Sequence, residues 1–136
     1  MSVTDTESTL RDYLDTLLGG GDFASFFSED VLWTTMETGD QIRGRDAVRD
    51  FIVALHTQLF DASPELHGLA VTDGTASLEA SFVGKHVAEF GGVPATGTEV
   101  RMPYAMFYDV DGGRITAVRA YFPVAALVQT LQAAAS

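Results

Sequence analysis

The chain has 136 residues, of which 46% are hydrophobic and 20% are charged, and these values are typical of one globular domain over residues 1–136. Its formal net charge of −11 argues against nucleic acid and anionic membranes as partners, because proteins that bind them need basic surfaces. The absence of cysteine excludes disulfides and thiolate chemistry, and with no signal-like N-terminus or membrane-length apolar run we expect a cytoplasmic protein.

The N-terminal segment predicts one long helix and one short one. Thr4 and Glu7 fit a capping box, and leucines at helical spacing follow them. The glycines at 19–21 end this helix, and Asp22 can cap a short second helix over 23–27.

A strand and a second long helix come next. Residues 31–37 combine β-branched and aromatic side chains, which is typical of a strand. Residues 45–60 place apolar side chains on one helical stripe, and Pro64 marks the end of that helix.

The second half of the chain predicts strands and a closing helix. Turn signals separate four strand-like segments, and a proline precedes the last helix. The expected strands are 65–72, 75–90, 98–110 and 114–122, and the expected helix is 123–135.

This order of elements predicts an α+β fold in which helices pack on one face of a curved, mostly antiparallel sheet. Gly68 and Gly84 are candidates for the bends or bulges that curl the sheet. Helices on one side of a curled sheet enclose a cone, and its open end is the expected small-molecule pocket.

Strand alternation indicates which side chains point into this cone. On 75–90 the inward set is Leu78, Ala80, Phe82, Gly84, His86 and Ala88. On 98–110 it contains Met102, Tyr104, Met106 and Tyr108. On 114–122 periodicity leaves two choices open, either Val118, Ala120 and Phe122 or Arg119 and Tyr121.

Three strings in this order resemble the nuclear transport factor 2-like superfamily and, within it, the SnoaL-like group. They are "SEDVLW" leading into "GRDAVRDFI", then "GKHVAEFGGVPATG", then "DGGRITAVRAYF". The resemblance covers nearly the whole chain and implies a cone-shaped α+β fold, homodimers through the sheet and chemistry without a cofactor. It also implies that Ala120, with Val118 and Phe122, points inward.

The resemblance reaches three enzyme types whose catalytic acids this chain lacks. Polyketide cyclases carry an acid late in the last strand. Limonene epoxide hydrolases carry an aspartate after the arginine in a string like "RDYFD", where this chain reads "RAYFP" with Ala120. Ketosteroid isomerases carry aspartates where this chain has Thr35 and Met106. We therefore expect none of the three mechanisms to operate here unchanged.

Three residues are candidate catalytic groups, each with a structural alternative. His86 matches a histidine of the family string and is either a general base or a hydrogen-bonded pocket residue. Tyr13 either donates to a substrate oxygen or belongs to the helix core. Glu37 is either an acid at the pocket mouth or a solvated turn residue.

The predicted function is acid–base chemistry, by cyclisation, isomerisation or elimination, on a hydrophobic oxygenated small molecule resembling a polyketide or terpenoid. The alternative is a binding protein that does not alter its ligand, which the missing acids favour. Neither hypothesis includes a cofactor. A metal site is not expected either, since His56 and His67 do not share a face with His86. The expected substrate-binding residues are Trp33, Thr35, Phe51, Leu55, Leu78, Phe82, Met102, Tyr104, Met106, Val118, Ala120 and Phe122.

Overall fold

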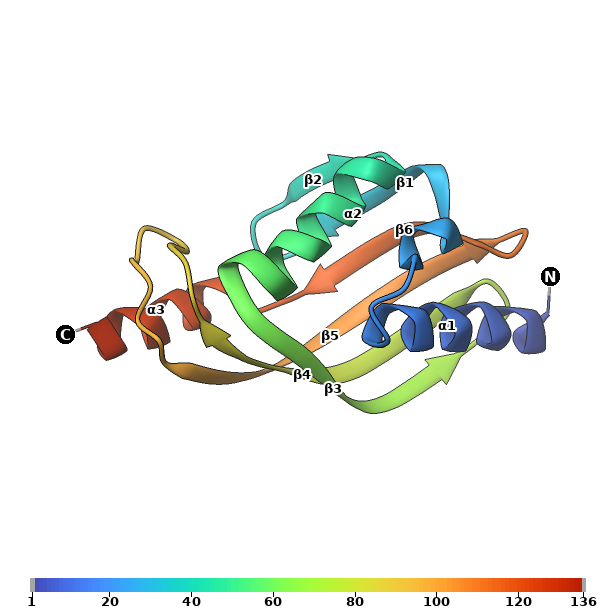
Figure 1. Ribbon diagram of the computed structural model, residues 1–136. Helices are drawn as coiled ribbons and strands as arrows, with labels where there is room; N and C mark the ends of the chain where they lie inside the picture. Colours follow the sequence, from blue (N-terminus) through green and yellow to red (C-terminus); the bar gives the residue numbers. More distant parts are fainter. Residues whose placement is uncertain (1, 136) are drawn as a thin grey trace.

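A six-stranded mixed sheet runs through the molecule and carries the helices (Figure 1). The computed structural model describes residues 2–135. The strand order is β2-β1-β6-β5-β4-β3, in which β1 and β6 are parallel and all other neighbours are antiparallel. The strands are β1 (Phe27–Thr35), β2 (Asp40–Arg43), β3 (Phe60–Val71), β4 (Thr75–His86), β5 (Glu99–Asp111) and β6 (Arg114–Tyr121).

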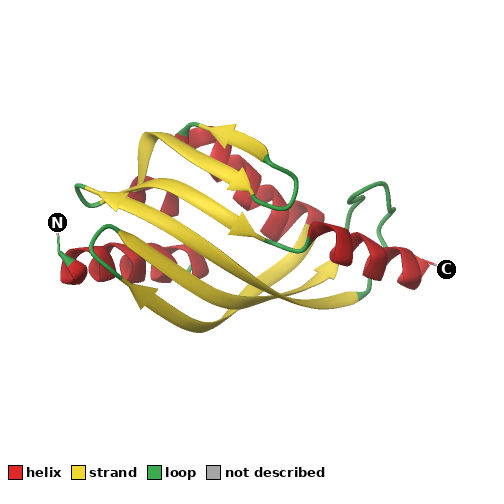
Figure 2. Ribbon diagram, turned by 180° about the vertical axis from the view of Figure 1, so that it is seen from behind, coloured by secondary structure: helices red, strands yellow, loops and turns green. Residues whose placement is uncertain are grey.

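Two long helices cover the same face of this sheet, and Figure 2 shows the opposite face without a helical cover. They are α1 (Val3–Leu18) and α2 (Arg45–Val53), and a π-helical turn, η2 (Ala54–Leu59), extends α2. A short 3₁₀ turn, η1 (Phe23–Phe26), links α1 to β1, and α3 (Val124–Ala135) extends from one end of the sheet. The predicted α+β cone, with helices on one face of a curved sheet, is confirmed.

The N-cap of the first helix lies two residues before the predicted one. Ser2, not Thr4, is the N-cap: its hydroxyl accepts from the Asp5 N–H at 3.1 Å, and the Asp5 carboxylate accepts from the Ser2 N–H at 3.2 Å. Thr4 was the wrong choice because the same hydroxyl-x-x-acid spacing also starts at Ser2. Glu7 instead pairs with Arg11 at 2.7 Å, one turn along the helix. Asp22 precedes the 3₁₀ turn but makes no side-chain capping bond.

Pro64 does not follow a helix end, as predicted, but lies inside β3, which begins directly after the π-helical turn at Phe60. The prediction was wrong because β3 is an edge strand, where a residue without an N–H need not interrupt the pairing with β4. The sequence also gave no signal for β2, a four-residue strand that forms a hairpin with β1. The strand predicted to reach residue 90 ends at His86.

The burial of side chains on β6 shows which of its residues point into the cone. Val118 and Ala120 are each 1% exposed and pack in the main core with Leu10 of α1. Arg119 lies on the other face, where its guanidinium donates two hydrogen bonds to the Asp109 carboxylate at 2.8 and 3.1 Å. A second core cluster, around Phe60 and Leu127, fills the end of the molecule where α3 packs.

The two strand glycines that were candidates for bends have different roles. Gly68 lies at a register shift between β3 and β4, so it marks a bulge as predicted. Gly84 lies in unbroken register, and a Cβ there would stand 2.6 Å from the Cβ of Ala62 on β3. Gly84 therefore permits a close approach of two backbones rather than a bulge.

We expect Gly84→Ala to lower the free energy of unfolding by about 1–3 kcal/mol, because the added methyl group overlaps Ala62 and the two strands must move apart. Gly68→Ala is the matched control, since a Cβ there meets no atom within 4 Å and its effect should stay within about 0.5 kcal/mol. Urea unfolding followed by circular dichroism measures both. Equal effects of the two substitutions would contradict the close-approach argument.

Candidate functional site

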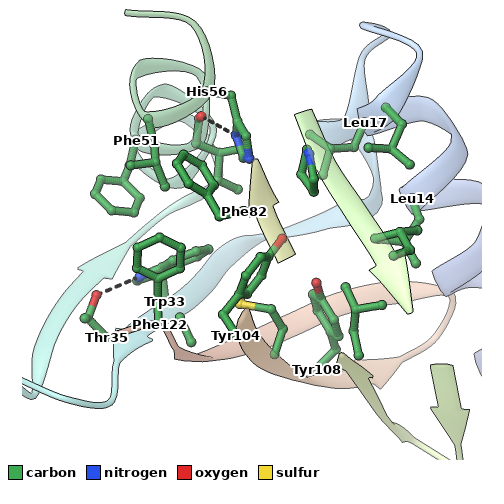
Figure 3. Close-up of a pocket in the computed structure, with 18 of the residues that line it drawn as sticks. Leu14, Leu17, Trp33, Thr35, Phe51, His56, Phe82, Tyr104, Tyr108 and Phe122 are labelled. Carbon is green, nitrogen blue, oxygen red and sulfur yellow. Dashed lines mark hydrogen bonds between the residues drawn. The ribbon is translucent and has the colours of Figure 1, made fainter. Parts of the chain in front are cut away.

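An apolar pocket lies between the inward face of the sheet and the helices α1 and α2 (Figure 3). The volume that the centre of a water-sized sphere can occupy in it is about 90 Å³, so the pocket is narrow. Among residues 2–135, no Asp, Glu, Lys or Arg lines it. Its walls come from α1, α2, η2, every strand except β2, the loop after β4 and the start of α3. They include Leu14, Leu17, Ile52, Pro64, Leu66, Phe90 and Val124, which were not predicted as lining.

Most of the residues named from the sequence line this pocket. They are Tyr13, Trp33, Thr35, Phe51, Leu55, Leu78, Phe82, Tyr104, Met106, Ala120 and Phe122. Four named residues do not line it. Val118 is buried in the main core, Met102 packs against the second cluster, and His86 and Glu37 lie elsewhere, as described below.

Three tyrosines bring hydroxyl groups to the pocket. Tyr104 and Tyr108 are four residues apart on β5 and therefore share its inward face, and Tyr13 comes from α1. The rings of Tyr13 and Tyr108 are 5.9 Å apart between centroids. Figure 3 shows the hydroxyls of Tyr104 and Tyr108 pointing into the same space. Within residues 2–135, no partner accepts or donates a hydrogen bond to any of the three hydroxyls.

Burial keeps these hydroxyls protonated. It raises the pKa of Tyr104 to about 12, because the surrounding apolar side chains disfavour the phenolate. Burial, and secondarily the neighbouring tyrosines, raise the pKa of Tyr13 and Tyr108 as well. All three side chains are therefore hydrogen-bond donors at neutral pH, free to bind an oxygen atom of a ligand.

His56, which we had considered only as a metal ligand, lies on the π-helical turn and lines the pocket. Its Nδ1 lies 2.8 Å from the Ile52 carbonyl oxygen, which can only accept, so Nδ1 carries the proton and Nε2 carries the lone pair. Figure 3 shows the ring beside Phe82, with Nε2 on the pocket side. Burial lowers the pKa of His56, and the bond to Ile52 opposes this only in part.

His56 is thus a neutral imidazole with a free lone pair in an apolar pocket. A signal for it existed in the sequence, because His56 follows Ile52 by four residues and so lies on the buried side of that helix. The π-helical turn itself had no signal in the sequence. Such turns occur frequently at functional sites.

His86 is fully buried, but away from the pocket. Its Nδ1 accepts from the Thr96 N–H at 3.2 Å and lies 3.0 Å from the Thr96 hydroxyl oxygen, and its ring packs against Phe60. Because Nδ1 accepts, the ring proton is on Nε2, which has no partner within residues 2–135. Through these contacts His86, the last residue of β4, stabilises the position of the loop 87–98.

Glu37 lies in the turn after β1, outside the pocket. Its carboxylate accepts from the Ala125 N–H at 3.0 Å, in the first turn of α3. A carboxylate at a helix N-terminus satisfies a free backbone donor and interacts favourably with the helix dipole. The contact gives Glu37 a structural role in holding α3.

Two of the positions at which the family resemblance implies acids contribute uncharged side chains to the pocket wall. Thr35 accepts a hydrogen bond from the Trp33 indole N–H at 3.0 Å, and Trp33 packs edge-on against Phe51 with ring centroids 5.2 Å apart. Met106 lines the pocket on β5. Between residues 2 and 135 there is no cluster of three or more His, Asp or Glu side chains that could hold a metal ion. Nor does that part of the chain contain a helix with the length and apolarity needed to span a membrane.

Comparison with known proteins places the chain in one family. A family model described as the SnoaL-like domain matches residues 10–118. No curated protein matches the chain.

Several solved structures share the fold. A proposed SnoaL-like polyketide cyclase from Jannaschia sp. CCS1 is 17% identical, with a TM-score of 0.84 over 96% of this chain and 93% of that one. AclR, a proposed hydroxylase from Streptomyces galilaeus, is 13% identical, with a TM-score of 0.80 over 97% and 98% of the two chains. A proposed ketosteroid isomerase from Kribbella flavida is 22% identical, with a TM-score of 0.69 over 89% and 79%. At these identities the likeness shows the fold alone.

We expect the lowered pKa of His56 to make the protein less stable as the pH falls. The unfolded chain takes up a proton on this histidine near its ordinary pKa of about 6.5, whereas the folded chain resists protonation. The free energy of unfolding should therefore fall between about pH 7 and pH 5.5, and it should fall less steeply in His56→Gln. Urea unfolding across this range measures both slopes.

His67→Gln is the control, because His67 lies on the outer face, where its Nε2 contacts the Ser81 hydroxyl at 2.8 Å. If His56→Gln loses stability with falling pH as steeply as the wild type, His56 is not held neutral by the fold.

Proposed function

The chain belongs to the SnoaL-like domain family, and from this premise we propose that it carries out acid–base chemistry on a hydrophobic, oxygenated small molecule bound in the cone pocket. Proteins of this fold family bind small-molecule ligands. The finer proposal concerns which groups act on the ligand. We assign the base to His56 and the hydrogen-bond donors to Tyr13, Tyr104 and Tyr108.

One observation carries this proposal: an uncharged pocket contains three tyrosine hydroxyls without partners and one neutral histidine with a free lone pair. A polar group in an apolar pocket is stabilised when a ligand supplies the missing hydrogen bond, so the three hydroxyl donors favour a ligand that accepts hydrogen bonds. The pocket contains no cation to neutralise an anionic ligand. A neutral ketone, enone or quinone oxygen fits this chemistry best.

The chemistry that the arrangement supports is removal of a proton from the carbon next to a carbonyl group. His56 Nε2 takes the proton, the C–H bond breaks, and its electron pair forms an enolate. The negative charge develops on the carbonyl oxygen, where tyrosine hydroxyls donate hydrogen bonds in surroundings of low dielectric constant. Return of the proton from His56 to the same or another carbon completes an exchange or an isomerisation.

The alternative is a protein that binds such a molecule without changing it. Thr35, Met106 and Ala120 stand where related enzymes carry acids, and all three line the pocket. The absence of these acids favours a binding protein without catalytic activity if His56 does not approach the ligand's acidic carbon. The two functions make different predictions for hydrogen exchange on a bound ketone.

We expect the protein to accelerate exchange of the methyl hydrogens of naphthyl methyl ketone in deuterated buffer, measured by mass spectrometry. His56→Gln should lower the accelerated rate by about 10²–10⁴-fold, as is typical when a general base is removed. Tyr104→Phe and Tyr108→Phe should each lower it by a smaller factor, because the remaining hydroxyls still donate.

His67→Gln is the matched control on the outer face, and His86→Asn tests the histidine first considered from the sequence. A large loss of exchange in folded His86→Asn, with His56→Gln unaffected, would transfer the role to His86. Binding of the ketone, reported by quenching of Trp33 fluorescence, without any accelerated exchange would favour the binding function. Trp33 is the single tryptophan of the chain and lines the pocket.

We further propose that the outer face of the sheet forms a homodimer, as the family resemblance implies. Phe107 and Tyr121 are 37% and 47% exposed on neighbouring strands of this face, with ring centroids 5.6 Å apart. Such an exposed aromatic pair is typical of the centre of an interface.

We expect wild-type protein to sediment as a dimer at micromolar concentration and Phe107→Glu to sediment as a monomer, because the substitution buries a charge in the interface. Val3→Glu, at a comparably exposed position on α1 and away from the outer face of the sheet, is the control. A monomeric wild type would contradict the proposal.

A further inference from the structure

A second hollow lies against the pocket and shares His56 with it. We call it the groove; it lies between the C-terminal end of α1, the π-helical turn η2 and the start of β3. The volume that the centre of a water-sized sphere can occupy there is about 390 Å³, compared with about 90 Å³ in the pocket. The groove therefore has room for a substituent of a ligand bound in the pocket.

The pocket and the groove share part of their walls. Leu17, Leu18, Ile52, His56 and Pro64 line both. His56 is the only polar side chain in this shared wall. A molecule that passed from one hollow to the other would cross the edge of the imidazole that we propose as the base.

The groove differs from the pocket in chemical character. Beyond the shared residues it is lined by Thr57 and Ser63, by the backbone of Gly20 and Gly21, and by a few apolar side chains. No charged side chain lines it, just as none lines the pocket. Together with the net charge of −11, this disfavours a phosphate, a carboxylate or a nucleotide carrier as part of the ligand.

We propose that the groove is a second subsite for the same ligand, which is a neutral, elongated molecule with two parts. Its carbonyl-bearing ring system occupies the pocket against the tyrosines, and a flexible substituent, such as an alkyl or hydroxyalkyl chain, leaves past His56 into the groove. This inference rests on the proposed function for the position of the ring. The inference adds the chemical class of the substituent and the direction in which the substituent extends.

The consequence for chemistry is that the groove selects the carbon that reacts. A substituent held in the groove places the carbon joining it to the carbonyl group beside His56. The hydrogens of that carbon are the ones that a base at this position removes. Ligands without a substituent are free to turn in the pocket and lose this selection.

The test compares two neutral probes, naphthyl methyl ketone and naphthyl pentyl ketone, by quenching of Trp33 fluorescence. Trp33 lines the pocket but not the groove, so quenching reports the ring in the pocket for both probes. The wild type should bind the pentyl ketone about tenfold or more tightly than the methyl ketone, since each buried methylene contributes to affinity.

Thr57→Phe fills the groove from the π-helical turn, and Thr57→Leu fills it in part. We expect the ratio of the two affinities to fall about tenfold in Thr57→Phe and by a smaller factor in Thr57→Leu. Gln58→Phe is the matched control, because Gln58 is the exposed neighbour on the same turn and lines neither hollow. It should keep the wild-type ratio.

Two negative outcomes are distinguishable. If both probes quench Trp33 but the ratio of their affinities is the same in Thr57→Phe and the wild type, the pentyl group leaves the pocket by another route. The groove is then not a subsite. If neither probe binds the wild type, the proposed ligand class is wrong and the inference fails with it.

Discussion

Burial of one face of the sheet beneath α1 and α2 is the constraint on which the rest of the structure depends. Because side chains alternate along a strand, this burial decides the environment of every second residue from β1 to β6. The outer face keeps the ion pairs of Arg101 with Glu65 and of Arg119 with Asp109. The inner face is almost wholly apolar, and the pocket forms where the helices and the sheet do not fill the space between them.

The same burial determines what the few polar groups inside can do. In an apolar environment a phenolate and an imidazolium are both disfavoured, so the tyrosines keep their protons and His56 gives its proton up. The pocket therefore holds donors and a base at neutral pH without any charged residue. Enzymes that use carboxylates must hold a charge in such a site, whereas the proton transfer that we propose uses neutral groups.

His86 and Glu37 make structural contacts outside the pocket. Each satisfies a backbone N–H group of a segment that packs at the end of the cone: Thr96 in the loop after β4 and Ala125 at the start of α3. Phe90 of that loop and Val124 of α3 both line the pocket. The two residues thus help to shape the pocket through the segments that they hold, without lining it themselves.

The sequence by itself determined the fold class, the order of most elements and the inward faces of β4 and β5, because hydrophobic periodicity reports directly which side of a helix or strand is buried. It identified most of the pocket lining for the same reason. It did not determine the strand β2, whose four residues are too few for a periodic signal, or the position of Pro64 inside an edge strand. Only the tertiary structure showed that His86 lies under the loop and His56 in the pocket. Periodicity places each histidine on the side of its element that faces the core, so periodicity alone does not distinguish them. The difference arises from which other elements pack against each, and these contacts join residues far apart in the chain.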